Sequence, residues 1–150
     1  MAKPPDKSGK PPRPQKARGF GEAQAPFQVG QGSLAALFEA YGFACAFTGK
    51  NLRAEVAADP YGALVRLDGA ATMSGTVIPA CLDAIHAFER GHLAIGTRYE
   101  FLVALDRIDP EFLERLNPIG RLSLPADPRF TPDAALLAVQ RAKFAEGLLD

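Results

Sequence analysis

Apolar residues recur with helical spacing at two places along the chain. Leu34, Leu37, Phe38 and Tyr41 lie three or four residues apart, which predicts a helix over residues 34–41 with Ser33 as its N-cap. A similar pattern over residues 80–90 predicts a second helix, with Gly91 just beyond its end.

Short apolar runs separated by turn signals predict strands. Residues 43–47 alternate large and small side chains, Gly49 lies in a predicted turn, and residues 52–57 are expected to pair back as a second strand. The alanines and the glutamate of 52–57 would also permit a helical turn. Further short strands or apolar elements are expected at 63–67, 77–78, 93–95, 99–105 and 121–124.

Two proline-containing signals predict helices near the C-terminal end of the sequence. Asp109 precedes Pro110 and is expected to cap a helix over residues 111–116, while Thr131 and Pro132 begin a helix that reaches about residue 146. Short strands and hairpins held by a few helices predict an α+β domain over residues 32–150.

Residues 1–31 differ from this domain in composition. Five prolines within residues 4–14 and a near absence of apolar side chains predict a disordered arm. The arm carries six basic residues and one acid within residues 1–20, a balance of +5, whereas residues 21–150 have a balance of −5. A basic arm attracts phosphate polyanions, so the expected nucleic-acid contacts are Lys3, Lys7, Lys10, Arg13, Lys16 and Arg18. A solubilising tail and a ligand for a groove on a protein partner are the alternatives.

Several classes of protein are disfavoured by the sequence. No apolar run approaches the roughly 18 residues of a membrane helix, so no membrane partner is expected. Two cysteines, Cys45 and Cys81, are too few for a disulfide scaffold or a structural zinc site, and we expect them to be small buried apolar residues in a reduced, cytoplasmic setting. No glycine-rich phosphate loop or GxSxG motif is present, and no resident cofactor is expected.

The stretch Gly75–Ile95 contains both histidines, His86 and His92, together with Asp83 and Glu89. Asp83 and His86 are three residues apart on one predicted helix, so their side chains share a face. These residues could take part in chemistry, or they could form an ordinary solvated helix face.

Three segments resemble the HNH endonucleases, specifically the branch with a helical C-terminal extension. Residues 44–49, ACAFTG, resemble its CxxTG opening, and residues 88–91, FERG, resemble the turn after its central helix. Residues 120–125, the Asp127-Pro128 pair and a final helix containing Arg141 resemble its closing block, so the resemblance covers about residues 43–145. It implies an HNH-like ββα core with short hairpins and flanking helices.

The resemblance implies phosphodiester hydrolysis with a divalent cation and a general-base histidine. The stretch that corresponds to the histidine-bearing strand, residues 53–60, contains no histidine, and the helix histidine falls at Ile85, one residue before His86. We therefore expect a nucleic-acid-associated HNH-like protein that has largely lost its catalytic residues and binds rather than cleaves. Lys50 and Arg53 are expected to supplement the arm in this binding.

Two alternatives remain. In the first, the chain is an active endonuclease that uses Mg²⁺ or another divalent cation, with His86 and Asp83 as catalytic residues and with Asp83, His86, Glu55 and Asp59 as metal ligands. In the second, it is a structural or protein-interaction module whose arm only increases solubility.

Overall fold

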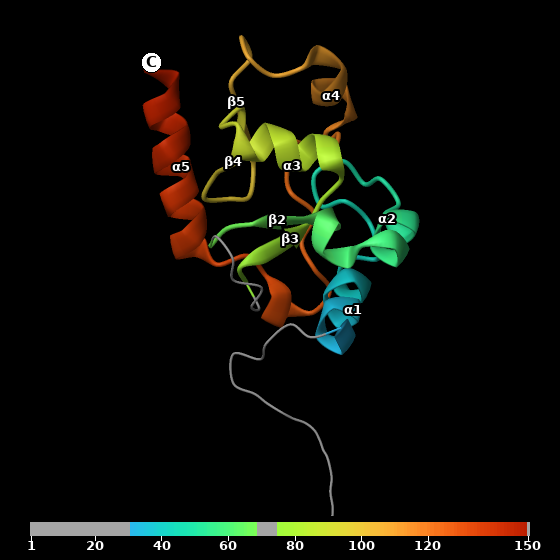
Figure 1. Cartoon of the computed structure of the whole chain (residues 1–150). Helices are drawn as coiled ribbons and strands as arrows, with labels where there is room; N and C mark the ends of the chain where they lie inside the picture. The colour runs from blue at the N-terminus through green and yellow to red at the C-terminus, as the bar shows by residue number, and fades with distance from the viewer. Residues whose placement is uncertain (1–30, 69–74, 150) are drawn as a thin grey trace, which may run out of the picture.

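Two short antiparallel hairpins form the sheets of the computed structural model, which describes residues 31–68 and 75–149 (Figure 1). In the first hairpin, β2 (Leu64–Arg66) pairs with β3 (Val77–Pro79), and Val65 lies opposite Ile78. In the second, β4 (Leu93–Ile95) pairs with β5 (Phe101–Val103), and Ala94 lies opposite Leu102. Helices joined to these small sheets confirm the predicted α+β class.

Helix α3 (Leu82–Glu89) follows β3 directly and contacts both β2 and β4 (Figure 1). Its buried face carries Ala84, Ile85, Ala87 and Phe88, and Gly91 ends the helix region with a φ of +75°. The prediction of this helix from apolar spacing is confirmed. The chain therefore contains a β2–β3 hairpin followed by a helix that packs against it.

The segment after α1 (Gln31–Ala40) differs from the sequence prediction. The helix begins at Gln31, so Ser33 lies within it and is not its N-cap. The predicted strand over residues 43–47 is wrong: this segment is a turn with one bridge, between Ala44 and Asn51. Phe43 has a φ of +55°, which is incompatible with a continuous strand.

The predicted second strand at residues 52–57 is also wrong. This segment is the helix α2 (Arg53–Ala58), which is followed by the 3-10 turn η2 (Pro60–Ala63). The helical alternative for this segment is thus the correct one, because Ala, Glu and Arg favour a helix when no partner strand is provided. The strand that pairs with β3 lies later in the sequence, at β2.

The last part of the chain contains α4 (Pro110–Arg115), the 3-10 turn η3 (Pro128–Phe130) and α5 (Ala134–Leu148), which packs against β4. Asp109 occupies the N-cap position of α4 but its side chain makes no capping hydrogen bond. The predicted start of the last helix at Thr131 is two residues too early, because Asp133 is the N-cap and accepts hydrogen bonds from the backbone of Ala135 and Leu136. The predicted strand at 121–124 is reduced to a bridge between Glu100 and Arg121.

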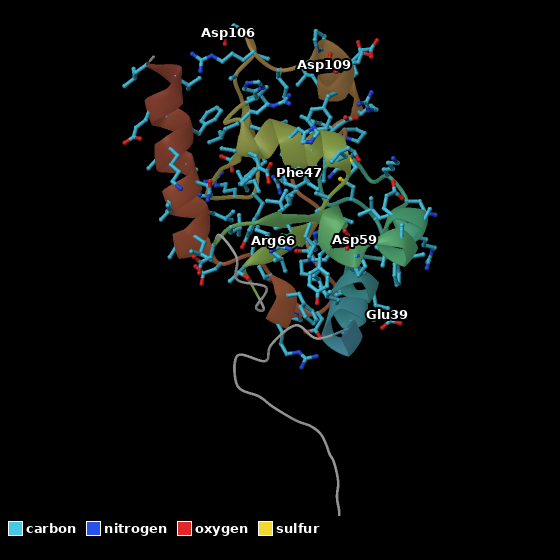
Figure 2. The ribbon with its side chains drawn as sticks, in the orientation of Figure 1. Glu39, Phe47, Asp59, Arg66, Asp106 and Asp109 are labelled. Atoms are coloured by element: carbon cyan, nitrogen blue, oxygen red, sulfur yellow. The ribbon has the colours of Figure 1, made fainter. Side chains whose placement is uncertain are left out.

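Phe47 lies near the middle of the molecule and joins these parts into one core (Figure 2). Its ring stacks on Phe101 with centroids 6.0 Å apart and meets Phe88 at 6.2 Å. The turn after α1, helix α3 and strand β5 therefore each contribute an aromatic residue to the core. None of the helices in the two described ranges is long and apolar enough to cross a membrane. Residues 1–30 of the arm predicted to be disordered (1–31) fall outside the described residues, whereas Gln31 lies in α1.

Candidate functional site: two hollows beside helix α3

Asp83, in the first turn of α3, lines two neighbouring hollows in the surface. Its carboxylate accepts a 2.6 Å hydrogen bond from Arg115 at the end of α4, and the two side chains form an ion pair. Both partners are about half exposed, so solvent screens this pair and its contribution to stability is small. Its geometric role is to connect α3 with α4 between the two hollows.

The first hollow, here called the histidine hollow, has a volume of about 250 Å³. Its polar lining consists of two histidines, two aspartates and two arginines: His86, His92, Asp83, Asp109, Arg90 and Arg107. These residues come from α3, the turn before β4, the loop after β5 and the start of α4, where Figure 2 labels Asp109. No residue of the β2–β3 hairpin lines this hollow.

The second hollow, here called the thiol hollow, has a volume of about 700 Å³. Thr48, Gly49 and Lys50 form one side of it, and Cys81, Leu82, Asp83 and Arg115 form the other. Lys50 Nζ lies 3.0 Å from Glu55 Oε2. The hydrogen bond to this carboxylate raises the pKa of Lys50, and the same contact lowers the pKa of Glu55.

The predicted metal ligands are not brought together. Glu55 pairs with Lys50, and Asp59 accepts a hydrogen bond from the Tyr61 backbone at the start of η2. Asp83 and His86 line the histidine hollow instead. In the described ranges, no three His, Cys, Asp or Glu side chains gather into a group that could hold a metal ion. Glu55, Asp59, Asp83 and His86 therefore do not form one site.

Two of the predicted nucleic-acid contacts belong to the described residues. Lys50 is engaged with Glu55, and the Arg53 guanidinium lies 4.5 Å from the centre of the Phe43 ring. The six basic residues of the arm, Lys3 to Arg18, lie outside the described residues. The contribution of the arm and of these two side chains to binding stays a prediction.

Sequence reasoning missed four residues that shape the two hollows. Asp109 and Arg107 complete the histidine hollow, Arg115 separates the two hollows, and Cys81 faces the thiol hollow. Asp83 and Arg115 are 32 residues apart, and Arg115 lies in an unremarkable polar position of its own helix. No local pattern marks such a pair.

The chain was compared with known proteins at three levels. No protein-family model, no curated protein and no solved structure matches it.

Proposed function

We propose that this chain is a nucleic-acid-associated protein with an HNH-like ββα core that binds without cleaving. The observation that carries the proposal is the environment of α3. The helix follows the β2–β3 hairpin, which has the ββα order that the HNH resemblance implies although it lies after residues 53–60, and the position that corresponds to the helix histidine is Ile85, which is buried and only 8% exposed.

The charged neighbours of α3 support binding over cleavage. Asp83 is paired with Arg115 and Glu55 with Lys50, so two of the carboxylates that a metal would need are neutralised by basic side chains. Neither β2 nor β3 contains a histidine that could replace the missing general base. A protein of this kind can retain an HNH-like shape without a means of activating water.

The basic arm supplies the electrostatic part of the proposal. The chain beyond residue 20 is acidic, with a balance of −5 over residues 21–150, so contacts with phosphates are assigned mainly to the arm, whose residues 1–20 have a balance of +5. Neutralising roughly five phosphates gives a slope of about −4 to −5 when log affinity is plotted against log salt concentration.

Fluorescence anisotropy with a labelled DNA duplex tests this proposal. The full chain is titrated at several salt concentrations beside a variant in which the six basic arm residues are changed to Gln. We expect the variant to lose most of the affinity and of the salt slope, whereas a matched Lys50→Gln, Arg53→Gln variant loses much less. An arm variant that binds as tightly as the parent would overturn the proposal, and absence of duplex binding by the parent at low salt would favour the interaction module.

A second candidate, an active endonuclease with a displaced histidine, draws on one observation: both histidines and two aspartates line the same hollow. Incubation of supercoiled plasmid with the full chain and Mg²⁺ or Mn²⁺ separates the candidates. The binding proposal expects no nicking. Nicking that is lost in His86→Ala would establish the second candidate instead.

A further inference from the structure

Two further hollows lie between the end of α3 and the helix α5. One has a volume of about 230 Å³ and extends toward β4, and the other has a volume of about 530 Å³ and extends toward the end of β2. They meet at four residues that line both: Phe88, Glu89, Gln140 and Lys143. The two hollows are therefore parts of one groove, here called the α5 groove.

Helix α5 lies at one edge of the molecule and is held on β4 (Figure 1). The Phe144 ring is buried in a small cluster with Ala94 of β4. The Arg141 guanidinium donates a hydrogen bond to the Ile95 carbonyl over 3.0 Å. These contacts fix α5 against the sheet and leave the α5 groove between this helix and the end of α3.

Apolar side chains line part of the α5 groove. Leu136 and Val139 contribute from α5, and Phe88 and Leu67 contribute from α3 and from the end of β2. Phe88 and Leu67 are buried, whereas Leu136 is half-buried and Val139 is 50% exposed. An apolar surface that is left open inside a groove is typical of a place that a partner covers.

The charge of the α5 groove is opposite to that of the surrounding chain. Residues 21–150 have a balance of −5. The charged residues of the groove are instead four basic and two acidic ones: Arg66, Arg90, Arg107, Lys143, Asp68 and Glu89.

Three of these basic side chains are available to a partner. Among the residues of 31–68 and 75–149, no carboxylate forms an ion pair with Arg66, Arg90 or Lys143. Arg107 is engaged, because its guanidinium donates to the Gly147 carbonyl over 2.7 Å. The groove thus combines an apolar strip with cations that lack a counter-charge.

We propose that the α5 groove binds a short acidic segment of a partner protein. Apolar side chains of this segment pack on Leu136 and Val139, and its carboxylates pair with Arg90 and Lys143. The part of α5 that lines the groove runs from residue 136 to residue 147, which is about 17 Å of helix, so a bound helix of roughly three turns matches it.

A protein segment fits this groove better than a nucleic-acid strand. Single-stranded nucleic acids are bound by stacking bases on exposed aromatic rings beside a basic track. The two aromatic residues that line the groove, Phe88 and Phe144, are only 7% and 8% exposed. The inference goes beyond the proposed nucleic-acid binding, which is assigned mainly to the basic arm.

Fluorescence anisotropy with a designed peptide tests the groove. The probe is a labelled helical peptide of about 15 residues, with leucines at i, i+4 and i+7 among glutamates. We expect saturable binding to the full chain, and binding weaker by roughly tenfold or more when the glutamates are replaced by lysines. Absence of saturable binding, or equal binding of the two peptides, would overturn the proposal.

The basic arm could attract an acidic peptide by itself, so the titration is repeated with the full-length variant whose six basic arm residues are changed to Gln. The peptide should bind this variant as tightly as it binds the parent. Binding that disappears with the arm charges would overturn the inference. The result does not depend on whether the parent binds duplex DNA, so failure here and failure of the proposed function are distinguishable.

Charge-reversal variants locate the contact. Arg90→Glu combined with Lys143→Glu should weaken peptide binding by roughly tenfold or more. The matched control is Arg98→Glu combined with Arg121→Glu, which changes the net charge equally at two exposed positions outside the groove. Equal losses of affinity in the two variants would show that only the net charge matters and would contradict the groove. Circular dichroism checks that both variants fold.

A second pair of variants tests the apolar strip. Val139→Gln should weaken peptide binding several-fold, because the partner's leucines lose an apolar contact. Leu124→Gln is the control, since Leu124 is also 50% exposed and lies outside the groove. Equal affinities of the two variants would contradict the apolar contact.

Competition with an unlabelled oligothymidine distinguishes the two classes of partner. In the arm variant, the oligonucleotide should not displace the bound peptide. Displacement that is lost in Arg90→Glu, Lys143→Glu would identify the groove as a nucleic-acid surface and overturn the proposal.

Discussion

The side-chain amide of Asn117 donates a hydrogen bond to the backbone carbonyl of Ala46 over 2.9 Å, joining segments 71 residues apart. The backbone N–H of Asn117 also donates to Phe47, over 2.8 Å, and the side chain donates to Arg121, over 2.9 Å. Ala46 and Phe47 are buried in a turn that has no sheet to satisfy its backbone. Asn117 therefore supplies donors that secondary structure does not provide here.

Replacing Asn117 by Ala should lower the free energy of unfolding by about 0.5–1.5 kcal/mol, since the Ala46 carbonyl loses its side-chain donor but keeps the backbone N–H of Ser123. Urea unfolding followed by circular dichroism measures this loss. Asn51→Ala is the matched control: Asn51 accepts one exposed hydrogen bond from the Arg53 backbone, and its loss should cost less. Equal losses of stability in the two variants would show that the hydrogen bonds of the Asn117 side chain do not stabilise the turn more than an exposed one does.

Phe47→Ala should destabilise the chain by about 3–5 kcal/mol, because a fully buried ring that touches Phe88 and Phe101 leaves a cavity. Phe47→Leu should cost clearly less. Leu105→Ala serves as the control, since Leu105 is 75% exposed and its truncation should change stability little. The measurement is again urea unfolding, and a Phe47→Ala loss as small as that of Leu105→Ala would be inconsistent with a shared core.

Gly91→Ala should cost about 1 kcal/mol for a backbone reason alone. The residue has a φ of +75°, and an added Cβ would meet no atom within 4 Å, so no clash contributes. Gly91→Asn should cost less, because Asn tolerates this conformation. Gly147→Ala, inside α5, should instead stabilise the chain by up to about 1 kcal/mol, because Ala favours a helix more than Gly does. Thermal unfolding of the three variants checks both signs.

Tyr41 should make stability fall at alkaline pH. Burial, with a smaller effect of Tyr99, raises the pKa of Tyr41 above its usual value of 10.0, and its hydroxyl donates to the Phe130 carbonyl over 3.3 Å. The folded chain therefore holds this proton more tightly than the unfolded chain. The stabilisation is fully present below about pH 10 and is lost as the pH rises further.

Urea unfolding at pH 7 and pH 11 measures this effect. The loss of stability between the two values should be smaller in Tyr41→Phe than in the parent. Tyr61→Phe is the control, because Tyr61 is 43% exposed and its replacement should leave the loss unchanged. An identical loss of stability between pH 7 and pH 11 in all three proteins would show that ionisation of Tyr41 does not cause it.

Sequence patterns predicted the elements whose determinants are local. The apolar spacing of α3 and the short apolar runs of β3 and β4 led to the right structures. The turn at residues 43–47 could not be predicted in this way, because three consecutive residues, Cys45, Ala46 and Phe47, are all buried. Their backbone partners include Pro79, Asn117 and Ser123, which are distant in the sequence.

The same limit applies to the candidate site. Asp83 and His86 could be placed on one helix from their spacing, and both line the histidine hollow. The residues opposite them, Arg107, Asp109 and Arg115, come from a later loop and helix, and only the tertiary fold brings them near. The predicted approach of Glu55 and Asp59 failed because their segment is a helix and a turn instead of a strand beside α3.

The bond between Ala46 and Asn117 has a consequence for synthesis on the ribosome. Ala46 emerges first, and its partner follows 71 residues later. At a synthesis rate of about 5–20 residues per second, roughly 4–14 s pass between the synthesis of Ala46 and that of Asn117, whose side chain donates to the Ala46 carbonyl. During that interval the nascent chain exposes an apolar ring at Phe47, so slowed translation of residues 48–117 should increase its capture by chaperones.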